Sequence, residues 1–461
     1  MPELPEVETV ARTLSPEIKG AKIVSLTCFR EKNIVNPYEE FVNGVVGKSF
    51  EGVSRRAKYL IFKLAPGGYI LSHLRMEGRY FYEEEGSPSR KHDILSYHLS
   101  NGYRLVYCDT RKFGRIAYLE NEESLQKALG KLGPEPFSLS SEEFHNRLSL
   151  IHKPIKEAIM DQSVIAGIGN IYADESLFKA KIHPQSRACS LSEGECESLL
   201  SSIKTILQEA IDLGGSTVKS YHPKEGVSGR MQNELLAYGK SDKPCPNCGA
   251  KLKRIALNGR GTTYCPLCQK RKGERYIVGV LGPIHSGKST LSSFLANKGY
   301  LLFDADKEAK KLYEFKSVRA KIAKLFPGSL KEDGSIDFRI IREAIAMDAE
   351  KKRSLNRIIF PLIKRKARNF ILKSPQKSLI VLDVPLLFAA DMGELCDLTV
   401  LVIAPPELQK ERLQKEDRDA SSLLALNADY PLEEAKKKAS LVIENAGSLE
   451  EFESKIARLF Q

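Results

Sequence analysis

Residues 276–289 read YIVGVLGPIHSGKS, and this stretch determines the fold of the C-terminal half of the chain. Its beginning has the apolar pattern of a buried strand, and residues 282–289 follow the phosphate-loop pattern G-x-x-x-x-G-K-S. In such a loop backbone N–H groups cradle phosphate oxygens, Lys288 reaches the β- and γ-phosphates, and Ser289 can bind Mg²⁺. The sequence therefore predicts a site for ATP with Mg²⁺ that is formed by Gly282, Pro283, Ile284, His285, Ser286, Gly287, Lys288, Ser289 and Thr290.

Strand-like runs continue beyond this loop, at residues 301–303, 378–383 and 399–403, and helical stretches separate them. This alternation predicts a parallel sheet with crossover helices, which is an α/β fold. Asp304 follows the second strand and Asp383 ends a later one. At the carboxyl edge of such a sheet Asp304 is placed to accept a proton from a substrate hydroxyl, and Asp383 to orient Mg²⁺ or the substrate.

These features, with LNRIIFPL at 355–362 and VIENAG at 442–447, resemble dephospho-coenzyme A kinase from about residue 277 to the C-terminus. The resemblance implies phosphoryl transfer from ATP to the 3′-hydroxyl of dephospho-coenzyme A, with Asp304 as the base and Arg412 closing over the phosphates. The chain departs from the family pattern on the acceptor and lid side, at Phe360, Glu416 (unless Arg418 takes the lid role), Asp429 and Ser440. Two interpretations therefore remain: an active kinase, or a module that only binds nucleotide.

Two cysteine pairs form a second motif, Cys245-Pro-Asn-Cys248 and Cys265-Pro-Leu-Cys268, with 16 residues between them. Two such knuckles complete a tetrahedral four-thiolate site, so the sequence predicts one structural Zn²⁺ bound by Cys245, Cys248, Cys265 and Cys268. Cations that suit contacts with DNA phosphates stand on the hairpin between the knuckles: Lys251, Lys253, Arg254 and Arg260.

The N-terminal residues 1–9 read MPELPEVET. Once Met1 is removed, Pro2 offers a secondary amine, and because an α-amine has a pKa near ~8, a usable fraction is neutral at pH 7. A neutral amine can attack a sugar C1′ and form an iminium, and the neighbouring Glu3 can donate or accept protons. Taken alone, these residues favour an unstructured N-terminus over a nucleophile.

Further motifs occur in one order along the N-terminal half: RRAKYL at 55–60, SHLRMEG at 72–78, DTRKFG at 109–114, LGPEP at 132–136, GIGNIYADE at 167–175 and GGST at 214–217. With residues 1–9 and the finger, they resemble formamidopyrimidine-DNA glycosylase over residues 1 to about 271. The resemblance implies a β-sandwich, a helix–two-turn–helix domain and a zinc finger. It also implies excision of 8-oxoguanine and formamidopyrimidines from double-stranded DNA, with strand cleavage by β,δ-elimination.

The resemblance implies a role for each matching residue. Pro2 is the nucleophile, Glu3 the acid and base, and Lys58 a cation beside the phosphates of the lesion. The others fill the gap left by the flipped nucleotide (Met76, Arg111 and Phe113) or hold backbone phosphates (Asn170 and Arg260). The residues alone favour a simpler interpretation, with Met76 and Phe113 in the core and Arg111 as a solvated charge. Leu4 favours the branch that acts on purine lesions, since endonuclease VIII-type relatives have glycine there.

The expected domains are a glycosylase β-sandwich at 1–132, the helix–two-turn–helix domain at 133–240, the finger at 241–271 and the kinase-like domain at 277–461. The chain has 461 residues, a formal net charge of +12 and 42% apolar residues, which suits a folded protein with a polyanionic partner. It has neither an apolar run of membrane-spanning length nor the pattern of a signal peptide, so a cytoplasmic location is expected.

Overall fold

A computed structural model describes residues 2–216, 230–415 and 430–460. These residues form two compact units. The first comprises residues 1–239 and 255–262, and the second comprises residues 240–254 and 263–461. Among the described residues, no helix combines the length and the apolar character needed to cross a membrane.

The first unit begins with helix α1 (Leu4–Ile18), followed by two antiparallel four-stranded sheets. One sheet has the order β1-β6-β7-β5, with bounds Ile23–Cys28, Asp93–Leu99, Tyr103–Asp109 and Gly78–Glu84. The other has the order β2-β3-β4-β8, with bounds Ser49–Arg56, Tyr59–Ala65, Tyr69–His73 and Arg115–Leu119. Aromatic side chains such as Phe62, Tyr80 and Tyr97 fill the shared core, and the apolar face of α1 packs into it. The predicted β-sandwich is therefore confirmed. The helical spacing of Val7, Val10, Ala11 and Leu14 predicts a helix over residues 3–14, and α1 confirms it.

The second part of this unit is helical, as its 3.6-residue apolar spacing predicts. It contains α4 (Ser141–Ser149), α5 (Ile155–Met160), α6 (Asn170–Lys179) and α7 (Glu193–Asp212). Ser192 begins α7 with a capping box, and Leu199, Ile203 and Leu207 bury its apolar face. The other α-helices among the described residues of the unit are α2 (Tyr38–Val45), α3 (Glu122–Leu129) and α8 (Met231–Glu234).

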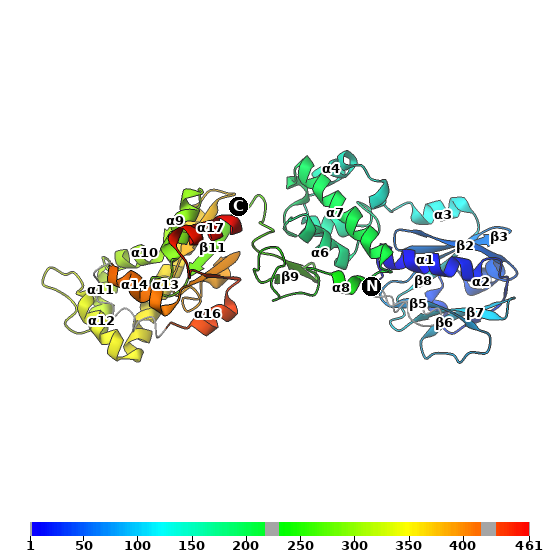
Figure 1. Cartoon of the computed structure of the whole chain (residues 1–461). Helices are drawn as coiled ribbons and strands as arrows, with labels where there is room; N and C mark the ends of the chain where they lie inside the picture. The colour runs from blue at the N-terminus through cyan, green and yellow to red at the C-terminus, as the bar shows by residue number, and fades with distance from the viewer. Residues whose placement is uncertain (1, 217–229, 416–429, 461) are drawn as a thin grey trace. The chain divides into compact units, whose positions relative to one another are not determined.

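Strands β9 (Lys253–Leu257) and β10 (Arg260–Tyr264) form the hairpin between the cysteine pairs (Figure 1). Its turn is Asn258-Gly259, and both residues have positive φ, 47° and 72°. This is the conformation that a two-residue hairpin turn requires, and Asn-Gly adopts it at low cost. The tip of the hairpin, residues 255–262, belongs to the first compact unit.

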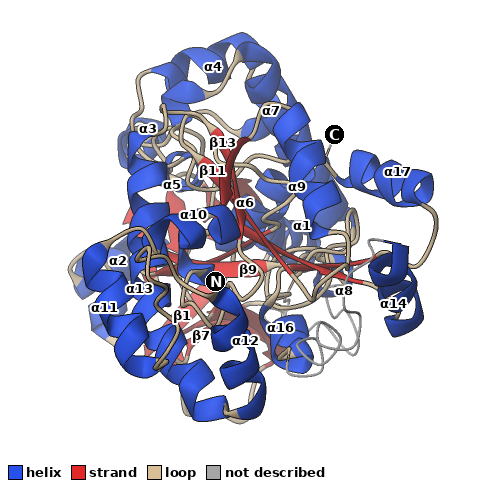
Figure 2. Ribbon diagram, turned by 90° about the vertical axis from the view of Figure 1, so that its left-hand side faces the viewer, coloured by secondary structure: helices blue, strands red, loops and turns tan. Residues whose placement is uncertain are grey.

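The second unit contains a five-stranded parallel sheet of order β12-β13-β11-β14-β15. The bounds in that order are Leu301–Asp304, Leu379–Asp383, Tyr276–Leu281, Leu398–Ile403 and Leu441–Glu444. Strands β11 and β13, side by side in Figure 2, pair in parallel register from Tyr276 opposite Leu379. The parallel sheet expected from the strand–helix alternation is thus confirmed.

Helices connect these strands, and one more helix, α17, follows the last strand. Their bounds are α9 (Lys288–Asn297), α10 (Ala305–Leu312), α11 (Lys316–Leu325), α12 (Phe338–Met347), α13 (Ala349–Lys373), α14 (Pro406–Lys415), α16 (Leu432–Lys438) and α17 (Leu449–Leu459). Because all strands are parallel, their carboxyl ends share one edge, where residues 282–287 run into α9. Glu416, Arg418 and Asp429 lie outside the described residues.

Candidate functional sites

Glu3 is buried at the start of α1, next to Pro2, and is only 1% exposed. Its carboxylate accepts hydrogen bonds from the backbone N–H groups of Gly169, at 2.6 Å, and Ile171, at 2.9 Å. Both donors lie at the N-terminus of α6, where the helix dipole favours negative charge. The N–H of Glu3 donates to Glu6 Oε2 at 2.8 Å, so the beginning of the chain is fixed from both sides.

Lys58 lies between β2 and β3, and its ammonium donates to the carbonyl of Ile168 at 2.7 Å. Burial raises the pKa of Glu3 although Lys58 opposes the shift. Burial likewise lowers the pKa of Lys58 although Glu3 opposes it. Desolvation therefore outweighs the attraction between the two charges, and both groups are shifted toward their neutral forms. A carboxyl group in this state suits proton transfer near neutral pH.

Gly169 is needed for this arrangement. A Cβ atom at this position would lie 2.3 Å from Cδ of Glu3, much closer than two carbon atoms can approach. The absence of a side chain lets the N–H of residue 169 reach the carboxylate. The spacing of the motif at 167–175 thus has a direct structural cause.

Sequence reasoning did not assign roles to Glu6 and Glu175, which organise the buried side of this site. Glu6 Oε1 accepts hydrogen bonds from the hydroxyl of Tyr172, at 2.5 Å, and the N–H of Ser216, at 2.8 Å. The carboxylate of Glu175 accepts from the three successive N–H groups of residues 236–238. The sequence feature that could have identified them is an acidic residue within a buried helical motif. A buried carboxylate needs several hydrogen-bond donors, so it tends to organise the backbone around it.

Met76 and Phe113 are exposed, by 37% and 52% respectively. The interpretation of these two residues as part of the core is therefore wrong. The guanidinium of Arg111 lies over the ring of Phe113, with its carbon 5.2 Å from the ring centre. The buried carboxylate of Asp109 holds this turn by accepting from the N–H groups of Arg111 and Gly114.

His73 holds the neighbouring turn, which carries Met76. Burial lowers the pKa of His73 to about 3, so the imidazole is neutral. Its Nδ1 accepts a hydrogen bond from the N–H of Arg75 at 3.0 Å. Two separate turns therefore present an apolar side chain, an aromatic ring and a cation at the surface of the first unit.

Asn170 and the tip of the hairpin are joined within the first unit. The side-chain amide of Asn170 donates to the carbonyl of Gly261 at 3.2 Å, and Lys156 donates to Thr262 Oγ1 at 2.8 Å. Lys156 also forms a buried ion pair with Asp174 at 2.7 Å. These contacts fix the backbone next to Arg260, whose side chain is exposed. Phosphate binding by Asn170 and Arg260 remains a prediction.

The four cysteines of the finger converge as their spacing predicts. Their sulfur atoms all lie within 4.8 Å of one another, with Cys245 and Cys268 at 3.9 Å and Cys248 and Cys265 at 3.5 Å. Tetrahedral zinc with bonds of about 2.3 Å places its sulfurs about 3.8 Å apart, so the residues fit the ion. Four thiolates leave no coordination position for a substrate, which makes the zinc site structural.

We expect replacement of Cys248 by serine to remove the zinc and to weaken binding to lesion-containing duplex at least about tenfold. The reason is that the metal fixes the hairpin carrying Arg260, and one hydrogen bond to a charged group contributes about 1.5–3 kcal/mol. Metal analysis and a fluorescence-anisotropy titration would measure both effects. Cys189→Ser, outside the cluster, should retain one zinc per chain and normal affinity. Zinc-free wild-type protein that binds normally would contradict the prediction.

The phosphate loop connects β11 to α9. Lys288, the first residue of α9, donates to the carbonyl of Pro283 at 2.6 Å within the loop. His285 and Gly287, the residue directly before α9, both have a left-handed backbone, with φ of 57° and 105°. Such a left-handed residue just before a helix turns successive N–H groups toward one point, which is a favourable arrangement for an anion.

Carboxylates at the end of β13 and in the first turn of α10 interact electrostatically with Lys288. Desolvation lowers the pKa of Lys288, while Asp383 and Asp306 oppose the shift. Burial, with smaller contributions from Asp304 and Asp306, raises the pKa of Asp383. Asp304 caps α10 by accepting from the N–H of Lys307 at 3.0 Å. The structure therefore brings the phosphate-loop lysine and the predicted acidic residues into one electrostatic cluster.

Arg412 lies beside the phosphate loop, and its predicted contact with the phosphates remains a prediction. Its guanidinium donates to the carbonyl of His285 and to Asn445 Oδ1, both at 3.2 Å. The amide of Asn445 in turn donates to the carbonyl of Ser286 at 2.9 Å. Asn445 belongs to the motif at 442–447, and its bracing role was not predicted.

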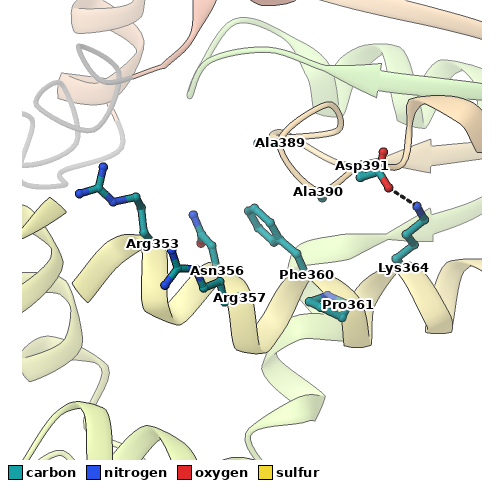
Figure 3. Close-up of a pocket in the computed structure, with 9 residues that line it drawn as sticks. All are labelled: Arg353, Asn356, Arg357, Phe360, Pro361, Lys364, Ala389, Ala390 and Asp391. Carbon is teal, nitrogen blue, oxygen red and sulfur yellow. Dashed lines mark hydrogen bonds and ion pairs between the residues drawn. The ribbon is translucent and has the colours of Figure 1, made fainter. Parts of the chain in front are cut away.

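Phe360 lines a cavity of about 490 Å³ between α13 and the loop after β13 (Figure 3). Figure 3 shows its other lining residues, which include the cations Arg353, Arg357 and Lys364, and Lys364 pairs with Asp391. A phenyl ring cannot donate a hydrogen bond, so Phe360 contributes apolar contact here. Ser440 is away from this cavity and is buried against Thr399, with their hydroxyl oxygens 3.1 Å apart.

Different parts of the chain match different known families. Residues 1–116 match the formamidopyrimidine-DNA glycosylase N-terminal domain, residues 132–222 the formamidopyrimidine-DNA glycosylase H2TH domain, and residues 242–271 the zinc finger found in FPG and IleRS. Residues 276–451 match dephospho-CoA kinase.

Relatives and solved structures match the first part of the chain. The formamidopyrimidine-DNA glycosylases of Lactococcus lactis subsp. cremoris and Bacillus subtilis are each 42% identical, over 275 and 282 residues, covering 59% of this chain and 100% of each relative. A Lactococcus lactis enzyme mutant in complex with Fapy-dG containing DNA has a TM-score of 0.56 at 41% identity, covering 59% of this chain and 100% of that one. The Lactococcus lactis enzyme bound to AP-site DNA has a TM-score of 0.55 at 40% identity, covering 58% and 100%.

Proposed function

This chain belongs to the formamidopyrimidine-DNA glycosylase family, and on that basis we propose that its N-terminal half excises 8-oxoguanine and formamidopyrimidines from double-stranded DNA. We propose further that it then cleaves the strand by β,δ-elimination. The observation that carries this proposal is the buried Glu3 carboxyl group, held by Gly169 and Ile171 directly beside Pro2. The pKa of Glu3 is raised, as a general acid requires.

The chemistry follows from these groups. The nitrogen of Pro2 forms a bond to C1′ of the damaged nucleotide, and the glycosidic bond breaks with its electron pair leaving on the base. Glu3 supplies the proton that opens the sugar ring, leaving an iminium on Pro2. Loss of the C2′ proton to a base then expels the 3′-phosphate, and loss of the C4′ proton expels the 5′-phosphate, each phosphate leaving with the electron pair of its C–O bond. Met76, Arg111 and Phe113 fill the gap that the flipped nucleotide leaves in the DNA duplex. Lys58, Asn170 and Arg260 contact phosphates of the DNA backbone.

Sodium borohydride tests this proposal because it reduces an iminium to a stable amine. Mixing the full chain with an 8-oxoguanine duplex and borohydride should yield a covalent protein–DNA complex and, without borohydride, strand cleavage. An undamaged duplex is the control. A protein that binds the lesion but neither cleaves nor becomes trapped would be a DNA-binding module, which is the competing interpretation.

The raised pKa of Glu3 gives a pH prediction. The acid form persists to higher pH than in an ordinary glutamic acid, and excision should decline as pH rises through the raised pKa. Glu3→Gln should lower the single-turnover rate by about 10²–10⁴-fold and remove this alkaline decline. Glu142→Gln, an exposed carboxylate on α4, is the matched control. An unchanged alkaline limb in Glu3→Gln would assign the proton to another group.

For the C-terminal half we propose ATP-dependent phosphorylation of dephospho-coenzyme A. Support comes from the phosphate loop, from Lys288 with the acids around it, and from Arg412 beside the loop. Asp304 takes the proton of the 3′-hydroxyl as its oxygen attacks the γ-phosphorus and ADP leaves with the bridging electrons. We propose that the anionic acceptor binds in the cavity whose lining includes Arg353, Arg357 and Phe360.

The second candidate is a module that binds nucleotide without transfer. It is favoured by Phe360, which places a ring without a donor on the acceptor side. The full chain, incubated with ATP, Mg²⁺ and dephospho-coenzyme A, separates the two. Formation of coenzyme A, detected by mass spectrometry, supports the kinase. ATP binding without product at high enzyme concentration supports the binding module.

A further inference from the structure

The base of the zinc finger, residues 240–254 with the second knuckle, belongs to the same compact unit as the parallel sheet. Hydrogen bonds join the base of the finger to the segments that flank the strands of this sheet. Lys251 donates through its backbone N–H to the carbonyl of Ser440 at 2.6 Å, and the ammonium of Lys253 donates to the carbonyl of Asp397. Lys251 and Lys253 were expected to contact DNA phosphates, but their side chains donate to carbonyls of the kinase-like domain, so that expectation is wrong for these two.

The ammonium of Lys251 caps α16. It donates to the carbonyls of Lys436 and Lys437, at 2.8 Å each, in the last turn of this helix. Carbonyls at a helix C-terminus lack partners within the helix, and a cation there also complements the helix dipole. Lys436 and Lys438 form ion pairs with Glu433 and Glu434 along the helix, so the finger supplies this capping charge.

Tyr276 connects the second knuckle to the phosphate-loop strand. It is the first residue of β11, is 2% exposed, and donates its hydroxyl to the carbonyl of Pro266. Pro266 directly follows the zinc ligand Cys265. Strand β11 is the central strand of the sheet and ends directly before Gly282. A buried hydroxyl without its acceptor is destabilising, so β11 depends on the position of this knuckle.

We propose that the zinc-bound base of the finger is a structural part of the kinase-like domain, and that zinc therefore stabilises the phosphate-loop sheet as well as the finger. The bound ion would fix both knuckles through their four thiolates. With the knuckles fixed, the Pro266 carbonyl stays in place to accept from Tyr276. Lys251 likewise stays at the end of α16, and Lys253 stays at the start of β14. This inference concerns stability and does not require either proposed activity.

Hydrogen–deuterium exchange on the full chain tests it, with the zinc-loaded protein compared with the chelator-treated protein. Peptides covering β11, β14 and α16 should exchange about tenfold faster without zinc, which corresponds to about 1.4 kcal/mol of local opening free energy. Peptides from α7 in the first unit are the internal reference. Faster exchange confined to residues 240–271, with β11 and α16 unchanged, would overturn the proposal.

Two variants separate the contact from the metal. Tyr276→Phe removes one hydrogen bond and Lys251→Met removes the two made by the ammonium, while all four cysteines stay, so both variants should retain zinc. Tyr276→Phe should speed exchange in β11, and Lys251→Met should speed exchange in α16. Because Lys251 is only half-buried, its replacement should leave the core intact. Lys243→Met, exposed on the same segment, is the matched control. Zinc-loaded variants that exchange like the wild type would also overturn the proposal.

Discussion

Replacement of Pro2 by glycine is expected to lower cleavage of an 8-oxoguanine duplex on the order of a hundredfold and to remove most of the borohydride-trapped complex. Glycine leaves a primary amine that the pyrrolidine ring no longer orients, and a displacement of about 1 Å at a reacting atom can reduce the rate about 10²-fold. Because Glu3 is held by backbone donors, its position should persist in the variant.

Single-turnover cleavage and gel analysis of trapped product would measure this effect. Mass spectrometry must first show that Met1 has been removed from both proteins. Pro16→Ala, within α1 and distant from the N-terminus in sequence, controls for a general effect of losing a proline. Cleavage at the wild-type rate by Pro2→Gly would assign the nucleophile to another amine.

Replacement of Lys288 by alanine is expected to weaken ATP binding about 10- to 100-fold and to remove phosphoryl transfer. Lys288 is partly buried in the phosphate loop, and a charge-assisted hydrogen bond contributes about 1.5–3 kcal/mol. Asp304→Asn should behave differently, with nearly unchanged ATP affinity and transfer lowered about 10²–10⁴-fold, because it removes the base and leaves the loop intact.

Isothermal titration with ATP·Mg²⁺ and a coenzyme A assay would compare these variants, with Lys298→Ala at the other end of α9 as the control. Equal loss of binding in Lys288→Ala and Asp304→Asn would show that Asp304 acts in nucleotide binding. Normal binding in Lys288→Ala would remove the basis for the phosphate-loop assignment.

Local patterns predicted much of this molecule. The apolar spacing of α1, the alternation of strands and helices after residue 276, and the spacing of the four cysteines each depend on neighbouring residues, and the structure confirms them. The phosphate loop could also be predicted from neighbouring residues, because a strand, a glycine-containing turn and a helix follow one another directly.

Contacts across long sequence distances could not be predicted in this way. Glu6 meets Ser216 across 210 positions, and Lys251 meets Lys436 across 185. A lysine on a hairpin is equally compatible with a DNA phosphate and with the end of a helix, and only the folded partner decides between them. For the same reason, Asn445 could be recognised as part of a motif but not as the brace of Arg412.

The main-chain partners of Glu3 bear on how the proposed glycosylase site tolerates random mutation. Its two donors are the N–H groups of residues 169 and 171, which nearly every amino acid possesses. Side-chain exchange at position 171 therefore leaves the donor in place, and only proline deletes it. Position 169 is sensitive for a different reason, since any Cβ would collide with the carboxyl group. Random substitution should thus inactivate the glycosylase at Gly169 with almost every replacement, whereas at Ile171 the loss should depend mainly on packing.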